Sequence, residues 1–224
     1  MKKITIAFIL FACGIFLGVG TATAAMTSPI LPGPETPLVG TGGILDQLYG
    51  FGNLQRVDDF GVLPNDQIWF NPGTGSATAQ AKYAAFDQDF GYIPDGGSFM
   101  SLFPVTGNGI NLGAPTAALA SGPYNFVWAL KPSGASQWTS KQSLNSDSEF
   151  DHMVTWLISG NEDNPNNPIG SYVIAWEDLP DGGDKDYNDL VVEVNVNPVP
   201  IPGAILLLGS GLLGLAGIRK KFKR

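Results

Sequence analysis

The chain has 224 residues, of which 20 are acidic and 12 are lysine or arginine, so its formal net charge is −8. This charge excludes a protein held on nucleic acid through the phosphates. A single cysteine excludes a disulfide framework. The single histidine, His152, has no nucleophile-elbow motif beside it that would indicate a serine hydrolase. We therefore expect neither a nucleic-acid partner nor an enzyme.

Residues 1–25 have the pattern of a secretory signal peptide. Two lysines precede a long apolar run, and Ala22 and Ala24 supply the small residues that signal peptidase requires. We therefore expect export across the inner membrane of a bacterium, with signal peptidase as a processing partner. The alternative is a lipoprotein signal, because the residues before Cys13 loosely resemble a lipobox. The apolar run continues past this cysteine, which disfavours the alternative.

Residues 26–43 are rich in proline, glycine and threonine and predict a flexible segment. The body of the chain, residues 44–197, contains short runs rich in Val, Ile, Thr and aromatic residues, separated by Gly, Pro, Asn and Asp. A short helix is expected at 43–50. This pattern predicts an all-β fold, a single β-sandwich or jelly-roll-like domain. The expected strands are 67–70, 81–86, 99–103, 124–130, 136–142, 152–158, 171–176 and 190–196.

The stretch WEDLPDGGDKDYNDLVVEV, residues 176–194, places six carboxylates in the turn between two expected strands, with Lys185 as its only basic residue. At about 6 Å and an effective dielectric near 20, two ionised carboxylates repel by on the order of 2–3 kcal/mol. A divalent cation would reverse this repulsion. Ca²⁺ suits the loop because it takes roughly six to eight oxygen ligands, whereas Mg²⁺ prefers fewer carboxylates and more water. The loop lacks the His and Cys ligands typical of Zn²⁺ or Cu²⁺. The alternative is a solvated acidic turn.

The body between the two ends carries all twenty acidic residues and only five basic ones, a charge of −15 that favours cations as partners. An EF-hand loop that began at Asp184 would need glycine at its sixth position and glutamate at its twelfth. Asp189 and Asn195 stand there instead, so the loop is not an EF-hand. If 152–158, 171–176 and 190–196 form an antiparallel meander, the residues before the first strand meet the loop at one sheet edge. The expected metal ligands are therefore Glu177, Asp178, Asp181, Asp184, Asp186, Asn188, Asp189 and Asp151.

The acidic stretch, together with FDHMVTWLISG at residues 150–160, resembles an uncharacterised secreted domain of unknown function. The resemblance rests on the Glu-Asp-Leu sequence, the Gly/Asp turn and the Asp-x-Asp-Tyr-Asn-Asp sequence that follows. That domain often accompanies PEP-CTERM tails. The resemblance implies an extracellular β-rich module with calcium binding, and it implies no reaction.

Residues 198–224 predict a membrane segment and a basic end. An apolar helix is expected at about 203–218, and the basic tail begins at Arg219, so the body would lie outside the inner membrane. With Pro200 and Pro202 before the helix, this end resembles a PEP-CTERM sorting signal. The resemblance implies an exosortase, a membrane cysteine transpeptidase, which removes the tail and delivers the protein to the cell surface or an exopolysaccharide matrix. The alternative is a permanent single-span anchor.

These features together predict a non-catalytic exported surface or extracellular-matrix protein. Its calcium-organised β-domain would have a structural or adhesive role in the envelope or in the exopolysaccharide matrix of a biofilm. The alternative is a calcium-dependent, lectin-like module that binds carbohydrate. Such a module would need an exposed aromatic platform. Most of the five tryptophans fall at expected strand positions and are expected in the core; if one of them is exposed, Trp138, in the polar run SQWTSKQ, is the best candidate.

Overall fold

The computed structural model describes residues 35–57, 67–113, 115–147 and 150–199. The predictions for the signal peptide, with Ala22 and Ala24, and for the sorting tail, with Pro200, Pro202 and Arg219, concern residues outside these ranges. Within these ranges, no helix combines the length and the apolar character that a membrane crossing requires.

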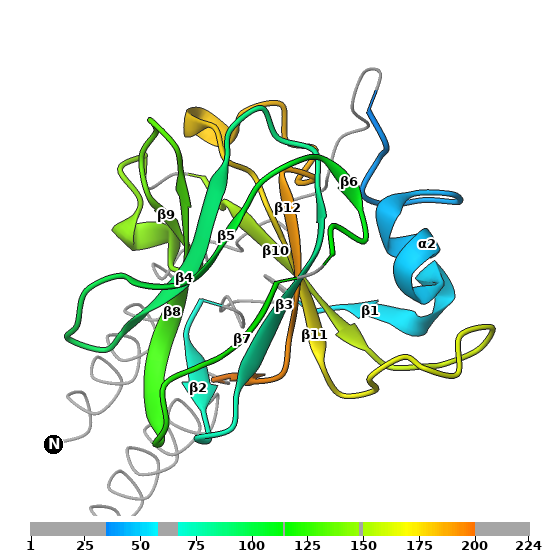
Figure 1. The fold of residues 1–224 in the computed structure, drawn as a ribbon, viewed down its shortest axis with the longest axis horizontal. Helices are drawn as coiled ribbons and strands as arrows, with labels where there is room; N and C mark the ends of the chain where they lie inside the picture. The colour runs from blue at the N-terminus through cyan, green and yellow to red at the C-terminus, as the bar shows by residue number, and fades with distance from the viewer. Residues whose placement is uncertain (1–34, 58–66, 114, 148–149, 200–224) are drawn as a thin grey trace, which may run out of the picture.

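Two antiparallel sheets and a few short helices make up the described chain (Figure 1), which confirms the all-β prediction at this level. In the first sheet the strands follow the order β1 (Leu54–Arg56), β10 (Met153–Ile158), β11 (Tyr172–Trp176), β12 (Leu190–Val194), β3 (Ser76–Lys82) and β6 (Gly109–Ile110), and β7 (Thr116–Ala118) also pairs with β3. In the second the order is β13 (Asn197–Pro198), β2 (Trp69–Asn71), β8 (Tyr124–Pro132), β4 (Gln88–Pro94) and β5 (Met100–Val105), with β9 (Trp138–Thr139) on β8.

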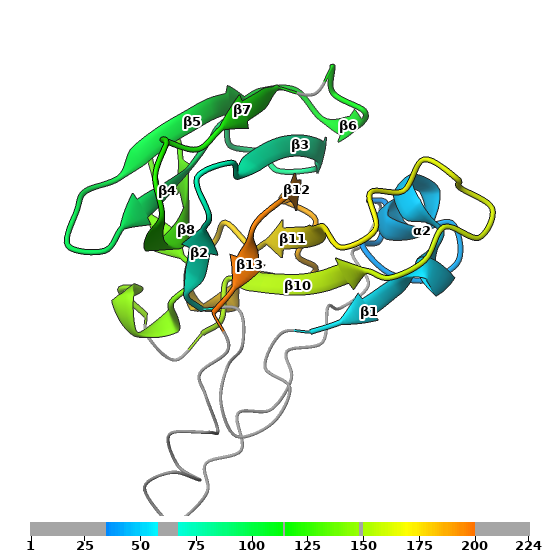
Figure 2. The same cartoon turned by 90° about the horizontal axis from the view of Figure 1, so that it is seen from below.

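The helices are short. The α-helix α2 spans Ile44–Tyr49, where the sequence predicts one, and three 3₁₀ turns follow along the chain. In Figures 1 and 2, α2 lies next to β1, at one end of the first sheet. The 3₁₀ turns are η1 (Phe51–Asn53), η2 (Gln142–Leu144) and η3 (Pro180–Gly182).

Two predicted strands differ from the structure. The run expected at 81–86 is only the end of β3, which begins at Ser76 and buries Ala77, Ala79 and Ala81 on alternate positions. Alanine has weak strand propensity, so the sequence pattern of residues 76–80 does not indicate a strand. The strand expected at 136–142 is reduced to the two residues of β9. The whole of β4 was missed.

Aromatic side chains join the two sheets. The Phe90 ring of β4 stacks on Trp128 of β8, with centroids 5.2 Å apart, and meets the edge of Trp176 of β11 at 6.3 Å. The Trp69 ring of β2 meets Tyr172 of β11 at 5.5 Å. Contacts of this kind add about 0.5–1.5 kcal/mol per pair to simple burial. The main core therefore lies where the two sheets pack against each other.

All five tryptophans are buried, as expected for core residues, and this includes Trp138, the candidate for exposure. Trp138 pairs with Leu130 of β8 in the second sheet. The indole N–H of Trp138 donates a hydrogen bond to the Asp178 carbonyl at 2.7 Å. The ring stacks on His152, with centroids 3.9 Å apart. The polar neighbours that suggested exposure are themselves satisfied, since Thr139 and Ser140 bond within the fold.

The first sheet is also covered on its other face. A second apolar cluster joins Leu38, Ile44 and Leu45 to β10, β11 and β12 through residues such as Val154 and Val191. Burial on both faces explains why these strands are nearly continuous apolar runs instead of alternating ones. Leu38 is buried although it lies in the Pro/Gly-rich segment before the helix.

Candidate metal site

The acidic loop is placed by three neighbouring strands. Strands β10, β11 and β12 form the antiparallel meander that the sequence predicts, and Trp176 pairs with both Met153 and Leu190. The start of β10, the end of β11 and the start of β12 consequently share one sheet edge. The Tyr187 hydroxyl donates to the Asp151 carbonyl over 2.6 Å and ties the loop to the residues before β10.

The backbone of the loop repeatedly enters the left-handed region. Asp181, Lys185 and Tyr187 have φ angles of 60°, 62° and 56°, and Gly182 and Gly183 have 75° and 44°. Such conformations cost of order 1–3 kcal/mol each for residues other than glycine. Gly183 is needed for a second reason, because a Cβ there would lie 2.0 Å from Glu177 Oε1. The loop is folded closely over the Glu177 side chain.

Glu177 is the centre of the site and is fully buried. Its Oε1 accepts a hydrogen bond from the Leu179 amide at 3.2 Å, and its Oε2 accepts one from the Lys185 amide at 2.9 Å. Burial, and next the charge of Asp189, raise the pKa of Glu177 to about 9. Two backbone donors are therefore too few to compensate the loss of water around this carboxylate.

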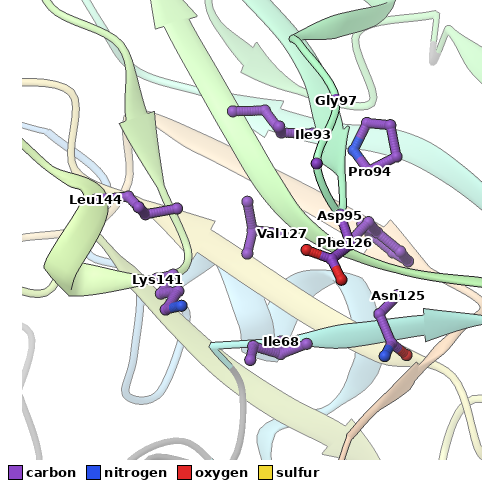
Figure 3. A pocket seen from close by; sticks show the side chains of 11 residues that line it. Ile68, Ile93, Pro94, Asp95, Gly97, Asn125, Phe126, Val127, Lys141 and Leu144 are labelled. Atoms are coloured by element: carbon purple, nitrogen blue, oxygen red, sulfur yellow. The ribbon is translucent and has the colours of Figure 1, made fainter.

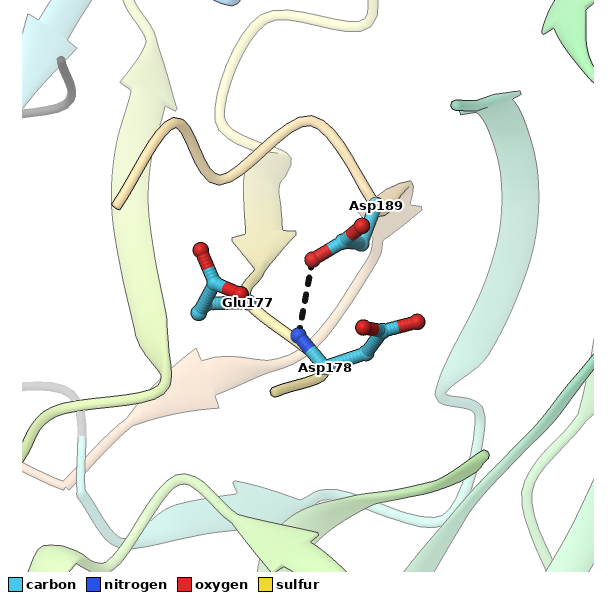
Figure 4. Close-up of side chains that lie close together, drawn as sticks. All are labelled: Glu177, Asp178 and Asp189. Carbon is cyan, nitrogen blue, oxygen red and sulfur yellow. Dashed lines mark hydrogen bonds between the residues drawn. The ribbon is translucent and has the colours of Figure 1, made fainter. Parts of the chain in front are cut away.

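Two triads of carboxylates meet at Glu177. In each triad, one oxygen per residue lies within 4.8 Å of the others. The inner triad is Glu177, Asp178 and Asp189, and the outer triad is Glu177, Asp184 and Asp186. Figure 4 shows the inner triad around the Glu177–Asp178 peptide, where the Asp178 amide donates to Asp189 Oδ2 over 2.8 Å. Asp178 and Asp186 are buried, whereas Asp184 is exposed.

The site is short of positive charge. Burial, followed by the charge of Asp178, raises the pKa of Asp189 to about 8. Burial also raises the pKa of Asp178, and it raises that of Asp186 to about 6. Lys185 does not compensate, because its Nζ lies over the Phe150 ring, 5.2 Å from the centroid. In the described part of the chain, no lysine or arginine forms an ion pair with the five carboxylates.

Within the acidic loop, two buried side-chain oxygens have no hydrogen-bond partner among the described residues. They are Asp186 Oδ2 and Asn188 Oδ1. The other Asp186 oxygen accepts from the Asn188 amide at 3.1 Å. The Asn188 side-chain amide donates to Glu35 Oε2 at 3.4 Å and to the Thr36 carbonyl at 3.2 Å, which leaves Oδ1 as the free acceptor. Buried acceptors without a donor are uncommon, and an ion is one of the causes.

The comparisons with known proteins identify part of the chain. Residues 119–197 match the family model described as Domain of unknown function (DUF4114). The DUF4114 match contains the acidic loop and β8 to β12, and it confirms that a domain of unknown function includes residues 150–194. The PEP-CTERM tail stays a prediction. No curated protein and no solved structure matches the chain.

Side chains from outside the DUF4114 region complete the site. Gln88, on β4, donates its side-chain amide to Asp178 Oδ2, and Glu35 meets Asn188 as described above. Neither residue is among the ligands predicted from the sequence. Glu35 is 153 positions from Asn188, and Gln88 lies on the strand that was not predicted, so no local signal could have found them.

Two of the predicted carboxylate ligands lie outside both triads. Asp181 is exposed, and its amide donates to Asp147 Oδ2 over 2.7 Å. Asp151 stands at the same sheet edge, and its Oδ1 accepts from the Met153 amide at 3.2 Å. His152 is fully buried beneath the site, with its ring nitrogens 2.9 Å from the Glu177 carbonyl and 3.0 Å from Asp147 Oδ2. This histidine positions the start of the loop.

A separate hollow of about 370 Å³ lies elsewhere on the surface (Figure 3). Its walls include Ile68, Ile93, Val127 and the exposed Leu144, and Phe126 is its only aromatic residue. It shares no residue with the acidic loop. A hollow without tryptophan or tyrosine offers little stacking surface for a sugar.

Proposed function

We propose that this chain is a non-catalytic exported protein whose β-domain is organised by Ca²⁺ at the acidic loop, with a structural or adhesive role at the cell surface or in an exopolysaccharide matrix. One observation carries the calcium assignment. Four aspartate carboxylates converge on the buried Glu177, none of the five acids forms an ion pair with a lysine or arginine in the described chain, and Asp186 Oδ2 is buried without a hydrogen-bond donor.

The donor set favours calcium over other ions. Every candidate ligand is a carboxylate or amide oxygen, which suits a hard cation, and the only histidine is held by Asp147 beneath the loop. Ca²⁺ accepts many carboxylates in flexible geometry, whereas Mg²⁺ requires a near-octahedral shell and retains water. An ion here would also offset the left-handed conformations of the loop, because it would hold the carboxylates that these turns bring together.

An ion bound at this site would cross-link the two sheets. The loop joins β11 to β12 of the first sheet, and Asp178 is also bonded by Gln88 and by Trp138 from the second sheet. The only cysteine, Cys13, lies in the proposed signal peptide, so the exported body would have no disulfide. Ca²⁺ would supply a cross-link in the extracellular medium, where sites of about 10⁻⁴–10⁻³ M affinity are occupied.

Export and sorting complete the proposal and rest on the two ends of the sequence. Signal peptidase would remove residues 1–25, and an exosortase-like transpeptidase would process the tail, residues 198–224, after a stage of anchoring in the inner membrane. All five tryptophans are buried, so none of them forms the exposed platform that the alternative, a lectin-like module, would need.

The test is thermal unfolding of the full chain, purified in mild detergent, in excess EGTA and in about 5 mM Ca²⁺. With a Kd of about 0.1 mM, mass action stabilises the folded state by about 2.3 kcal/mol. For a domain of this size the melting temperature should rise by roughly 5–9 °C. Equal Mg²⁺ should give a much smaller shift. The control Asp95→Asn should retain the full gain, because Asp95 lies in the turn 94–97, which has the same sequence PDGG as residues 180–183 of the loop but belongs to neither triad. No gain with Ca²⁺ up to tens of millimolar would refute the calcium assignment.

A further inference from the structure

We propose that the acidic loop holds two divalent cations, an inner ion on Glu177, Asp178 and Asp189 and an outer ion on Glu177, Asp184 and Asp186, which share the Glu177 carboxylate. This inference rests on the proposed calcium function and adds the number of ions and the residues that hold each. The proposal divides the predicted ligand set into two sites of different character.

The geometry separates the two sites. The triads have no member in common except Glu177, and within each triad the oxygens lie within 4.8 Å of one another. That separation is close to the distance between opposite ligands of an ion with metal–oxygen distances of about 2.3–2.6 Å. Each triad is therefore compact enough to surround its own ion.

Glu177 is able to bridge. Each of its two oxygens accepts one backbone hydrogen bond, from Leu179 or from Lys185, and keeps a second lone pair. These two bonds also fix the carboxylate in place, because both donors belong to the loop backbone. A carboxylate held in this way can present an oxygen to each triad without rotating.

The charge of the fully ionised cluster favours more than one ion. One divalent cation would leave three of the five negative charges without compensation, and two cations would leave one. The buried Lys82 forms no direct ion pair with the acids, since its Nζ donates to the Ala84 carbonyl at 2.8 Å and to Asn108 Oδ1 at 3.0 Å, and its charge acts on Asp178 only from a longer distance. Burying several unpaired carboxylates in one place is costly, and a second ion removes most of that cost.

An independent observation points to an ion in the outer triad. Asp186 is 1 % exposed, and its Oδ2 has no hydrogen-bond partner among the described residues. Asp186 does not belong to the inner triad, so an inner ion would leave this oxygen unsatisfied. Asn188 Oδ1, also buried and unpartnered, lies two residues further along the loop. The outer triad also includes the exposed Asp184, so its ion would keep contact with solvent.

The test counts ions. Equilibrium dialysis of the full chain against Ca²⁺, with metal analysis, should give two ions per wild-type chain and per Asp95→Asn control. Asp184→Asn removes only the outer ion and should give one. Asp189→Asn removes only the inner ion and should also give one, and Glu177→Gln should bind none at the same free Ca²⁺. Since Asp184 is exposed, its variant should fold like the wild type, which the far-UV circular dichroism spectrum checks.

The outcomes separate this inference from the proposed function. One ion per wild-type chain overturns the two-ion arrangement and leaves a calcium-organised domain. No bound ion overturns both. Two ions in Asp184→Asn would show that the outer triad is not a site. Calorimetric titration should resolve the two steps in the wild type and a single step in each of the aspartate variants.

Discussion

Asp189 is the residue whose replacement best distinguishes the apo and calcium-bound states. Without Ca²⁺, burial and the charge of Asp178 disfavour its ionised form and raise its pKa. Only its Oδ2 is engaged, by the Asp178 amide, so asparagine can keep that acceptor while removing the charge. The residue is thus unfavourable in the empty site and needed in the occupied one.

We therefore predict that Asp189→Asn changes stability with opposite signs in the two states. In EGTA the variant should melt roughly 2–4 °C above the wild type, corresponding to about 1 kcal/mol. In about 5 mM Ca²⁺ it should lose a large part of the calcium gain, because the inner ion lacks a ligand. Differential scanning calorimetry measures both values. A variant that is less stable than the wild type in EGTA would show that the charge of Asp189 is compensated without metal.

The residues of the site differ in how far the sequence could predict them. The five triad members lie within 13 positions of one another, and their composition alone indicates a cation. Glu35 and Gln88 reach the site only through the packing of the Pro/Gly-rich segment and of β4. In the sequence, Asp181 cannot be told apart from the other aspartates of the loop. In the structure its backbone is left-handed and its side chain belongs to neither triad.

The loop as an element should respond to pH in a way that depends on calcium. The pKa values of Glu177, Asp178, Asp186 and Asp189 are all raised, chiefly by burial. Between the ordinary carboxylate values near 4 and these raised values, the folded chain binds more protons than the unfolded chain. Raising the pH through this window therefore reduces the free energy of unfolding of the apo protein.

We predict that in EGTA the melting temperature falls between pH 5 and pH 9, and that the gain from Ca²⁺ grows over the same range. The gain grows because ionised carboxylates are the ligands and protons compete with the ion. Melting curves at pH 5, 7 and 9, with and without Ca²⁺, provide the measurement. The slope in EGTA should be smaller in Asp189→Asn, which lacks one of the titrating groups. An apo protein that gains stability toward pH 9 would contradict the prediction.

At the scale of elements, β10, β11 and β12 were predictable because they are rich in β-branched and aromatic residues, and their meander follows from short connections. β3 and β4 were not. The alternate alanines of β3 give little hydrophobic signal, and β4 contains Gly91, where a Cβ would lie 2.1 Å from the Met100 carbonyl of β5. Glycine weakens strand propensity, but here it allows close approach of two backbones.

Across the whole molecule, calcium should stabilise the second sheet as well as the loop. Gln88 and Trp138 both bond Asp178, so a fixed Asp178 restrains β4 and β9. The Ser140 amide, which donates to the Trp128 carbonyl over 3.0 Å, reports on β9. The Val57 amide, which donates to Thr155 over 3.1 Å beyond β1, reports on the far edge of the first sheet.

We predict that Ca²⁺ slows hydrogen exchange at Ser140 by up to about 50-fold, the mass-action factor for about 2.3 kcal/mol. Val57, at the sheet edge that opens locally, should change little. Exchange followed by mass spectrometry or NMR, in EGTA and in Ca²⁺, gives both rates. Protection confined to residues 177–189 would show that the ion orders the loop without joining the sheets.

The place of β12 in the first sheet has a consequence for how the chain folds. β12 lies between β11 and β3, and Val191 pairs with Ala81 far back in the sequence. Until this late strand arrives, β3 and β11 each keep an open edge, and both apolar clusters lack a wall. Contacts of such long sequence separation form slowly. Because the acidic loop immediately precedes β12, an ion bound there would stabilise this last strand of the first sheet as it docks, and metal binding would belong to a late step of folding.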